Sequence, residues 1–455
     1  MEFIELLDLK HIWHPCSQMK DYEEFKPLVI KGASGSHIEL QNGKKLIDAI
    51  SSWWCKSLGH NHPSLKTALR QQLEKFEHVI LANTTHEVIV ELSRQLAALI
   101  PSLNKVFYAG DGSCAVEVAM KMSLHSRIIA NDQKRIKFIA LKNSYHGETA
   151  GALSVSDLGL YRSPYTAMLF EPFYISEIPY VSNITVGQWN NCAHQWEGIE
   201  RSLQPYAEIT TAVIVEPIVQ GAAGMKIYSQ DFLARLSQWA KIHNIHLIAD
   251  EIMTGIGRTG KMLACEHAKI IPDFICLSKG LTSGWLPFSV VLTHDKIYNH
   301  FYDDYETGKA FLHSHTYSGN ALGASVALAT LQIIHEENLC EKAAALSETL
   351  YRNMNIVAEK TGQLVNIRNI GAIVAADLRH NPACPRLGYE IYKEAIKLGA
   401  LLRPLGNTIY WLPPLNIEPF LIEELKDITI NAIKRVCVRI GFQTKKKSKL
   451  NPKHA

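Results

Sequence analysis

Short runs of apolar residues alternate with longer amphipathic stretches from about residue 65 onward. The runs rich in Val, Ile, Leu and Phe are VFYA at 106–109, KFIAL at 137–141, TAVIVE at 211–216, HLIAD at 246–250, FICLS at 274–278 and SVVLT at 289–293. Such runs predict buried strands, and the helical stretches between them predict crossover connections. We therefore expect an α/β fold with a mainly parallel sheet that helices cover on both faces.

The pattern changes after about residue 330, where long amphipathic helices mix with strands such as AIVAADL. A chain of 455 residues exceeds the usual size of a single core, so we expect a large domain at 61–329 and a smaller α+β domain at 330–442. Residues 1–60 contain the turn-separated runs GSHIEL and KKLIDAI, which we expect to pack with the small domain. Residues 443–455 form a basic tail, and we expect it to be disordered.

Composition narrows the class of protein. A net charge of +3 gives no electrostatic reason to bind nucleic acid or a membrane surface. The N-terminus lacks a basic and apolar leader, and no apolar run is long enough to span a bilayer, so we expect a cytoplasmic protein. Nine cysteines, an odd number without a CxxC pair, argue against a disulfide framework and against a structural metal site.

The most informative pair of residues is Asp250 and Lys279. Asp250 ends one apolar run, and Lys279 follows the next run 29 residues later. An aspartate that keeps a pyridine nitrogen protonated, with a lysine that holds an aldehyde as a Schiff base, suits pyridoxal 5'-phosphate chemistry. Either residue alone is more often a solvated charge at the end of a strand.

Three other segments follow predicted strands and carry candidate groups. The turn at Gly112 and Ser113 opens a helix, whose free N–H groups suit a phosphate monoester, although a serine N-cap is the ordinary alternative. Tyr145 in NSYHGET is placed to stack on a planar cofactor or to sit in the core. Glu216 offers a carboxylate for a ring contact or an ion pair.

Two arginines and one loop add candidate ligands for substrates. Arg258 lies in GIGRTG and Arg403 in LLRPLG, and either is suited to bind a carboxylate through two hydrogen bonds or to remain a surface charge. The segment HSHTYSGN contains Ser314 and Thr316, whose hydroxyls suit a substrate or phosphate site. Asn320 in the same segment is alternatively the cap of the next helix.

Together the segments NSYHGET, EPIVQGAAGM, LIADEIMTGIGRTGKMLACEH, LSKGLTSG and HTYSGNALG resemble the class III aminotransferases of the fold type I pyridoxal phosphate superfamily, over nearly the whole chain. The resemblance implies that Lys279 forms the Schiff base and that Asp250 pairs with the pyridinium nitrogen. It also implies that Tyr145 stacks on the ring and that Gly112 and Ser113 bind the phosphate. Thr316 would reach the same site from the second subunit of a homodimer with shared active sites.

The segments HIWHPCSQM at 11–19 and SSWWCKSLGHNHP at 51–63 resemble one branch of this family. That likeness implies amino transfer from S-adenosylmethionine to 8-amino-7-oxononanoate. Trp53 and Trp54 would form a flat apolar wall for the bulky sulfonium donor, and Arg258 and Arg403 would serve substrate carboxylates, Arg403 that of the keto acid. Two positions depart from the branch: Cys16 replaces an aromatic residue, and Glu148 replaces a shorter acid.

Several alternatives remain open at this point. The stretch FYDDYETGKAFLHSHTYSGNALG resembles a form that uses lysine as the donor, while the paired Trp53 and Trp54 favour adenosylmethionine. Another class III aminotransferase with a different amine would share the core motifs. A nucleotide-dependent dehydrogenase is suggested by GDGS, but the glycine spacing is not GxGxxG. Lys279 and Asp250 argue against a non-catalytic carrier of the cofactor.

Overall fold

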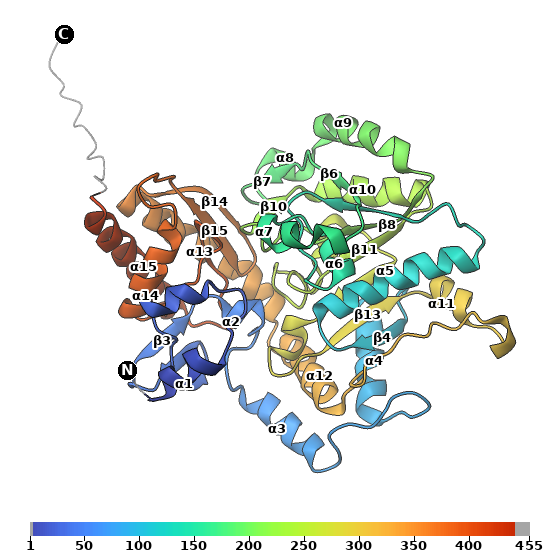
Figure 1. Cartoon of the computed structure of the whole chain (residues 1–455), viewed down its shortest axis with the longest axis horizontal. Helices are drawn as coiled ribbons and strands as arrows, with labels where there is room; N and C mark the ends of the chain where they lie inside the picture. Colours follow the sequence, from blue (N-terminus) through green and yellow to red (C-terminus); the bar gives the residue numbers. More distant parts are fainter. Residues whose placement is uncertain (1–2, 442–455) are drawn as a thin grey trace, which may run out of the picture.

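A seven-stranded sheet forms the centre of the larger body of the computed structural model, which describes residues 3–441 (Figure 1). The strand order is β4-β13-β12-β11-β8-β5-β6. Pairings from β12 to β6 are parallel, and β13 runs antiparallel to both of its neighbours. The strands are β4 (Lys105–Ala109), β13 (Ser289–Thr293), β12 (Phe274–Leu277), β11 (His246–Asp250), β8 (Thr210–Val215), β5 (Lys137–Leu141) and β6 (Phe173–Ile175).

The mainly parallel α/β fold expected from the sequence is confirmed. All six strands predicted from apolar runs are present, each with limits within one residue of the expected ones. Strand β6 was not predicted, because three residues are too few to carry a recognisable periodicity.

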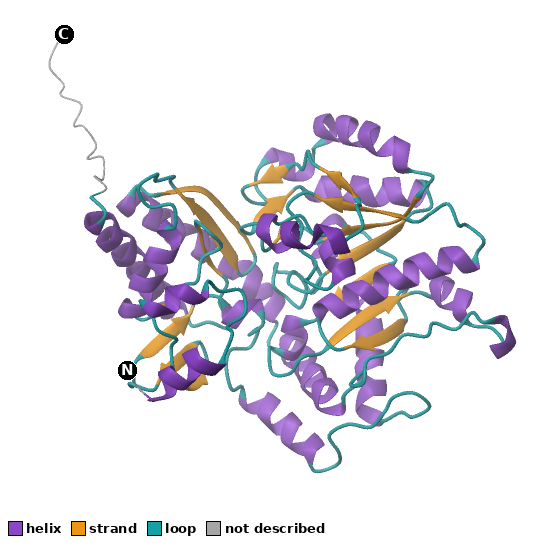
Figure 2. Cartoon of the chain, viewed as in Figure 1, coloured by secondary structure: helices purple, strands orange, loops and turns teal. Residues whose placement is uncertain are grey.

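Helices cover both faces of this sheet, as Figure 2 shows. One face packs on α5 (Gly112–Ile129). The other face packs on α10 (Gln230–Ile242) toward β5, and on α4 (Glu87–Leu99) and α12 (Ala321–Glu336) toward β4. Every residue of β8 and β12 is buried, which explains why these strands read as continuous apolar runs without alternation.

The remaining elements of the larger body are short or peripheral. They are α3 (Pro63–Leu73), α6 (Ala150–Ser154), α7 (Gly159–Arg162), α8 (Gly187–Asn190), α9 (Ala193–Leu203), α11 (Asp295–Phe301) and a small sheet of β7 (Tyr180–Val181), β10 (Lys226–Tyr228) and β9 (Val219–Gln220). Single 3-10 turns occupy Met19–Glu23, Ser163–Met168, Gln204–Tyr206, Ala264–Ala268, Lys279–Thr282 and Tyr305–Thr307.

A smaller body contains the C-terminal part of the chain and the N-terminal strands, which lie on the same side of the molecule in Figure 1. Its antiparallel sheet has the order β14-β15-β17, and β16 pairs in parallel with β3 to complete a second sheet. Its elements are α1 (Phe3–His11), β1 (Ile30–Ser34), β2 (His37–Leu40), β3 (Lys45–Asp48), α2 (Ser51–Trp54), α13 (Leu339–Thr361), β14 (Leu364–Ile370), β15 (Ile373–Leu378), α14 (Leu387–Leu398), β16 (Ala400–Leu401), β17 (Thr408–Trp411) and α15 (Pro419–Arg439).

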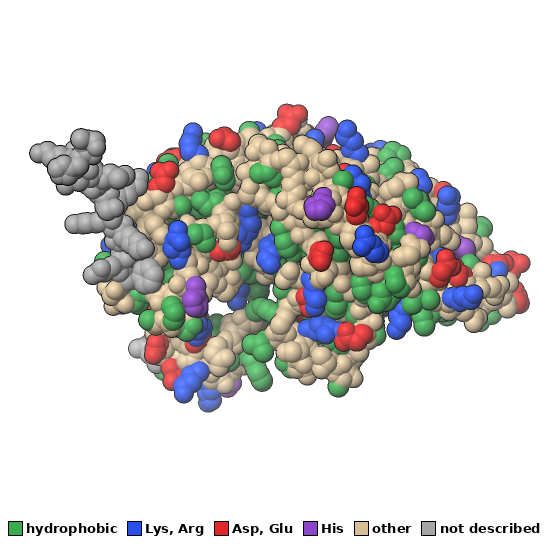
Figure 3. Space-filling model, turned by 90° about the horizontal axis from the view of Figure 1, so that it is seen from above, with side chains coloured by type: hydrophobic (Ala, Val, Ile, Leu, Met, Phe, Trp, Pro, Cys, Tyr) green, Lys and Arg blue, Asp and Glu red, His purple; other side chains and the backbone are tan. Residues whose placement is uncertain are grey.

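The expected domain limits after residues 60 and 329 stay a prediction, and helix α12 runs across the second of them. The expected basic tail at 443–455 lies outside the described residues. Within residues 3–441, no helix is both long and apolar enough to cross a membrane. Figure 3 shows charged side chains of both signs spread over the surface and a hollow between the two bodies.

Candidate active site

Three neighbouring strands bring candidate residues to one edge of the large sheet. Strands β12, β11 and β8 are adjacent and parallel, so their carboxyl ends meet at that edge. The chain continues from these ends into Lys279, Asp250 and Glu216. The structure therefore brings together the pair singled out in the sequence and adds a second carboxylate beside it.

Lys279 is the cationic centre of this group. Its Nζ lies 4.7 Å from the ring centroid of Trp54. Burial lowers the pKa of the Lys279 amine below its ordinary value, and the charges of Asp250 and Glu216 oppose that shift. Lys279 also has a positive φ of 41°, a conformation that costs a residue with a side chain about 1–3 kcal/mol and occurs most often at functional sites.

Asp250 is held from two sides. Its side chain is buried, with Oδ2 2.8 Å from Nδ1 of His146, and Oδ1 accepts a hydrogen bond from the Ile252 N–H. His146 is also buried, and its Nε2 has no hydrogen-bond partner among the described residues. His146 is the neighbour of Tyr145 in the sequence, and nothing in that segment indicates that it reaches Asp250 on another strand.

Glu216 is fully buried on the adjacent strand. Its two carboxylate oxygens accept hydrogen bonds from the backbone N–H groups of Tyr145 and Gly221. Burial raises the pKa of Glu216 to about 7, a shift that His146 opposes and Asp250 reinforces. A carboxyl with this pKa changes its charge near neutral pH, next to the amine of Lys279.

The turn after β4 and the loop after β5 pack closely together. Asp111, and not Ser113, caps α5 by accepting the Cys114 N–H, so the helix begins at Gly112. A Cβ on Gly147 would lie 2.1 Å from the Ser113 Oγ, which makes glycine necessary there. This packing leaves the positive N-terminal end of the helix facing the site.

A cavity of about 330 Å³ joins the helix terminus to the lysine. It is lined by Cys55, Asp111, Gly112, Ser278, Lys279, Thr282, Gly284, Trp285, Leu286 and Pro287. The N-terminal end of α5 and the Lys279 side chain therefore line the same open cavity.

The segment just before Cys55, which lines this cavity, has an unusual backbone turn. Four consecutive residues without glycine, Ser51 to Trp54, have φ values of 50°, 44°, 75° and 74°. A left-handed conformation costs about 1–2 kcal/mol per residue, so other contacts must hold this turn. Trp54 is buried and its Nε1 donates to the Tyr410 hydroxyl at 3.0 Å, while Trp53 remains 41% exposed.

Arg403 lies beside this turn. Its guanidinium lies 4.6 Å from the ring centroid of Trp53, and its Nη2 donates to the Cys16 carbonyl at 2.9 Å. The Cys16 Sγ lies 2.7 Å from the hydroxyl of Tyr161, a residue that the sequence did not single out. Cys16 thus connects the N-terminal segment to both bodies.

Glu148, the second position that departs from the family pattern, belongs to the same set of contacts. The rings of Tyr161 and Tyr145 meet edge to face with centroids 6.1 Å apart, and the Tyr145 hydroxyl donates to Glu148 Oε1 at 2.9 Å. Burial, reinforced by Glu148, raises the pKa of Tyr145 well above its ordinary range. Tyr145 therefore stays a neutral phenol.

Arg258 lies apart from Arg403. It is only 2% exposed, and its Nη1 donates to the carbonyls of Pro413 and Ala372. Burial lowers the pKa of Arg258 to about 9, and its Nη2 is buried without a partner in the described part of the chain. The two arginines thus occupy different environments, because Arg258 is buried and Arg403 is only partly buried.

Ser314 and Thr316 lie on an exposed loop of the larger body. The loop contacts outer residues, with the Thr316 carbonyl 2.8 Å from His78 Nε2 and His313 Nδ1 2.8 Å from Lys121 Nζ. Asn320 caps α12, as the alternative reading expected. Among the described residues of one chain, neither hydroxyl forms a hydrogen bond with Lys279.

Comparisons with known proteins agree with this geometry. Residues 18–433 match the family described as Aminotransferase class-III. The adenosylmethionine-8-amino-7-oxononanoate aminotransferase of Helicobacter pylori is 43% identical over 421 residues, which is 91% of this chain and 93% of the relative. The solved structure of the enzyme with that name from Methanocaldococcus jannaschii is 33% identical, with a TM-score of 0.88 over 95% of this chain and 98% of the other.

A PLP-bound amine transaminase from an uncultivated Pseudomonas species is also similar, at 28% identity and a TM-score of 0.84 over 95% of this chain and 99% of that one. Fold and site together define a fold type I pyridoxal phosphate-dependent transferase. The chain belongs to the class III aminotransferases, and its cofactor is pyridoxal 5'-phosphate. The dehydrogenase and the non-catalytic carrier considered from the sequence are therefore wrong.

The residues present fit this cofactor. The cavity has a helix N-terminus suited to a phosphate dianion at one side and the Lys279 amine at the other. Asp250 supplies a buried carboxylate beside them, as a protonated ring nitrogen requires.

The raised pKa of Glu216 predicts a pH-dependent effect of Glu216→Gln on the stability of the apoenzyme. The folded-state pKa is about 7 against an ordinary 4.5, so the stabilisation is complete below pH 4.5 and is lost as the pH rises to 7. The variant lacks this titration, and its free energy of unfolding relative to wild type should rise by about 2–3 kcal/mol between pH 5 and pH 8.

Urea unfolding of both apoproteins at each pH measures this difference. Glu337→Gln, at an exposed side chain after α12, is the matched control. A difference between Glu216→Gln and wild type that stays flat from pH 5 to pH 8 would show that Glu216 keeps its charge when folded.

Proposed function

We propose that this enzyme transfers an amino group from S-adenosylmethionine to 8-amino-7-oxononanoate, forming 7,8-diaminononanoate in biotin biosynthesis. The observation that carries the proposal is the turn at 51–54, which holds two aromatic rings side by side in the sequence. Trp54 faces the Lys279 amine, and Trp53 faces the guanidinium of Arg403. Relatives named for this reaction support it, at 33–43% identity over most of the chain. The reaction would take place in the cytoplasm.

The site residues divide the work of the reaction. Bound pyridoxal phosphate supplies an electron sink next to the carbon that carries the amino group. Gly112 and Ser113 hold the phosphate, Tyr145 packs on the ring, and Asp250 keeps the ring nitrogen protonated. Lys279 binds the cofactor covalently and, once displaced by a substrate amine, moves the proton at the reacting carbon.

The environment of Lys279 suits that proton transfer. Burial lowers its pKa, so a larger fraction of the amine is neutral near pH 7 and able to accept a proton. An arginine in the same place would stay protonated and could not serve as a base. Glu216, with its pKa of about 7, keeps a second titratable group beside the ring.

Donor and acceptor occupy this site in turn, so its two arginines serve different carboxylates. We assign the keto acid carboxylate to Arg403, which is partly exposed and lies against Trp53. The enclosed Arg258, with an unpaired buried Nη2 among the described residues, suits the carboxylate of the donor. Trp53 and Trp54 favour adenosylmethionine over lysine, because a sulfonium cation gains from an aromatic face.

The working unit we propose is a homodimer. The phosphate site needs the Thr316 hydroxyl, which is exposed within a single chain. Exposed apolar side chains near that loop, including Ile80, Leu312 and Tyr317, favour burial against a second copy.

A single-turnover experiment tests the choice of donor. Adenosylmethionine should bleach the visible absorbance of the bound cofactor at least tenfold faster than lysine at equal concentration. Lys279→Ala should abolish this change and covalent trapping by borohydride. Equal or faster conversion by free lysine would show that lysine is the amino donor. Borohydride trapping of the cofactor on another lysine residue would overturn the role of Lys279.

Arg403→Ala should slow the keto acid half-reaction at low substrate concentration. Removing a charge-assisted carboxylate contact costs about 2 kcal/mol or more, which is about thirtyfold in rate. The donor half-reaction should stay within about threefold of wild type. Arg258→Lys is the contrast and should impair the donor half-reaction instead. Equal losses in both half-reactions for Arg403→Ala would remove the carboxylate assignment.

Light scattering tests the assembly. The active enzyme should have twice the 51.0 kDa mass of the chain. Thr316→Val should weaken cofactor retention while leaving that mass unchanged, because it removes one hydrogen bond to the phosphate. A fully active monomer would contradict the shared site.

A further inference from the structure

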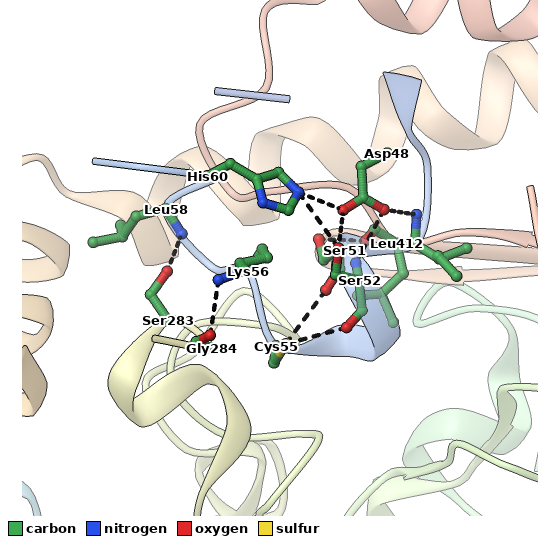
Figure 4. A network of polar contacts seen from close by, with 11 residues as sticks. Asp48, Ser51, Ser52, Cys55, Lys56, Leu58, His60, Ser283, Gly284 and Leu412 are labelled. Carbon is green, nitrogen blue, oxygen red and sulfur yellow. Dashed lines mark hydrogen bonds and ion pairs between the residues drawn. The ribbon is translucent and has the colours of Figure 1, made fainter. Parts of the chain in front are cut away.

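A buried carboxylate holds the left-handed turn from Ser51 to Trp54. Asp48 has no exposed surface. Its Oδ1 accepts hydrogen bonds from the N–H groups of Ile50 and Ser52, at 3.3 and 3.0 Å. Its Oδ2 accepts the Ser52 hydroxyl at 2.7 Å and lies 2.8 Å from His60 Nε2, as Figure 4 shows.

His60 reaches Asp48 from a different segment. A two-residue antiparallel bridge fixes its backbone, because Gly35 and His60 exchange N–H to carbonyl bonds of 3.0 and 2.7 Å. The position of the imidazole is thus set by the N-terminal strands. Burial raises the pKa of Asp48, but hydrogen bonds from His60 and Ser52 outweigh that effect and keep it below its ordinary value. Asp48 is therefore a paired, charged anchor.

The same segment is attached to the loop that follows Lys279. Lys56 Nζ donates to the Gly284 carbonyl at 2.8 Å, and the Leu58 N–H donates to the Ser283 hydroxyl at 3.0 Å. On the other side, the Ser51 hydroxyl donates to the Leu412 carbonyl at 2.7 Å. Figure 4 shows these contacts around the turn.

The turn fixes two aromatic faces at once. Trp54 lies against the Lys279 amine and Trp53 against the Arg403 guanidinium. Neither tryptophan touches Asp48 or His60 through a hydrogen bond given by the structure. Any influence of the buried pair on substrates must pass through the backbone of the turn.

We propose that Asp48 and His60 are positioning residues that set the placement of Trp53 and Trp54, and through them the fit of both substrates. The inference rests on the proposed role of Trp53 and Arg403 in substrate binding. It gives a specificity role to two residues that lie outside the cavity. The pair acts as a unit, because the hydrogen bond with His60 is one of the contacts that keep the pKa of Asp48 below its ordinary value.

Hydrogen exchange tests the anchoring without any use of activity. In the His60→Ala holoenzyme, backbone amides at 50–56 should exchange at least tenfold faster than in wild type. His60→Gln, which retains an N–H donor, should restore most of the protection. Asp48→Asn should behave like His60→Ala, because an amide has one acceptor oxygen where the carboxylate has two.

A second aspartate–histidine pair, which is only partly buried, supplies the control. His294 Nε2 lies 2.9 Å from Asp273 Oδ1, and Asp273 Oδ2 accepts the Leu247 N–H. This pair lies at the amino ends of β11 and β12, the sheet edge opposite to Lys279. His294→Ala should leave exchange at 50–56 and the substrate constants unchanged.

Kinetics test the consequence. His60→Ala should raise KM for 8-amino-7-oxononanoate at least tenfold with kcat within threefold, and the double variant with Trp53→Ala should be no worse than Trp53→Ala alone. Unchanged exchange at 50–56, multiplicative effects in the double variant or equal effects in His294→Ala would each overturn the proposal. If His60→Ala does not fold, His60→Gln and Asp48→Asn carry the same comparisons.

The two proposals fail in different ways. If the wild-type enzyme does not aminate 8-amino-7-oxononanoate, the proposed function is wrong. Faster exchange at 50–56 in His60→Ala would still support the anchoring role of Asp48 and His60. An active enzyme whose exchange at 50–56 is the same in His60→Ala and wild type removes only the anchor.

Discussion

The gathering of one amine and two buried carboxylates at the same sheet edge is the constraint on which the structure depends. Lys279, Asp250 and Glu216 follow three adjacent parallel strands, so the sheet alone brings them together. A buried charge is stable only with partners, and here each group has at least one of opposite sign or a pair of N–H donors. Because the strands are buried on both faces, a slip by one residue would turn these side chains away from one another.

Electrostatic balance at this edge also sets the chemistry. The pKa of the Lys279 amine is lowered and that of the Glu216 carboxyl is raised, and burial is the main cause of both. The same desolvation that destabilises the charges therefore brings two groups toward neutrality. The backbone strain lies around them: φ is positive at Lys279 and throughout the turn at 51–54. Strain of this kind persists only where the surrounding contacts over-determine the conformation.

The sequence predicted what depends on local pattern and missed what depends on distant contacts. The strands and the pair of Asp250 and Lys279 follow from apolar runs and the residues that end them. The left-handed turn could not be predicted, because Ser and Trp have no preference for positive φ and the cause is Asp48, a side chain held by His60. The contact of Tyr161 with Cys16 joins residues 145 positions apart, and nothing in either segment indicates it.

The two arginines also show that a sequence pattern does not reveal the environment of a side chain. From the sequence Arg258 and Arg403 had the same two possible roles, yet the structure buries Arg258 and leaves Arg403 partly exposed. Burial lowers the pKa of the Arg258 guanidinium. A substrate carboxylate that enters stabilises this buried charge, because it turns a single desolvated charge into an ion pair. The partly exposed guanidinium of Arg403 already has Trp53 as a partner, so it is destabilised less when a ligand leaves. A site that must bind one substrate, release its product and accept another has use for both kinds.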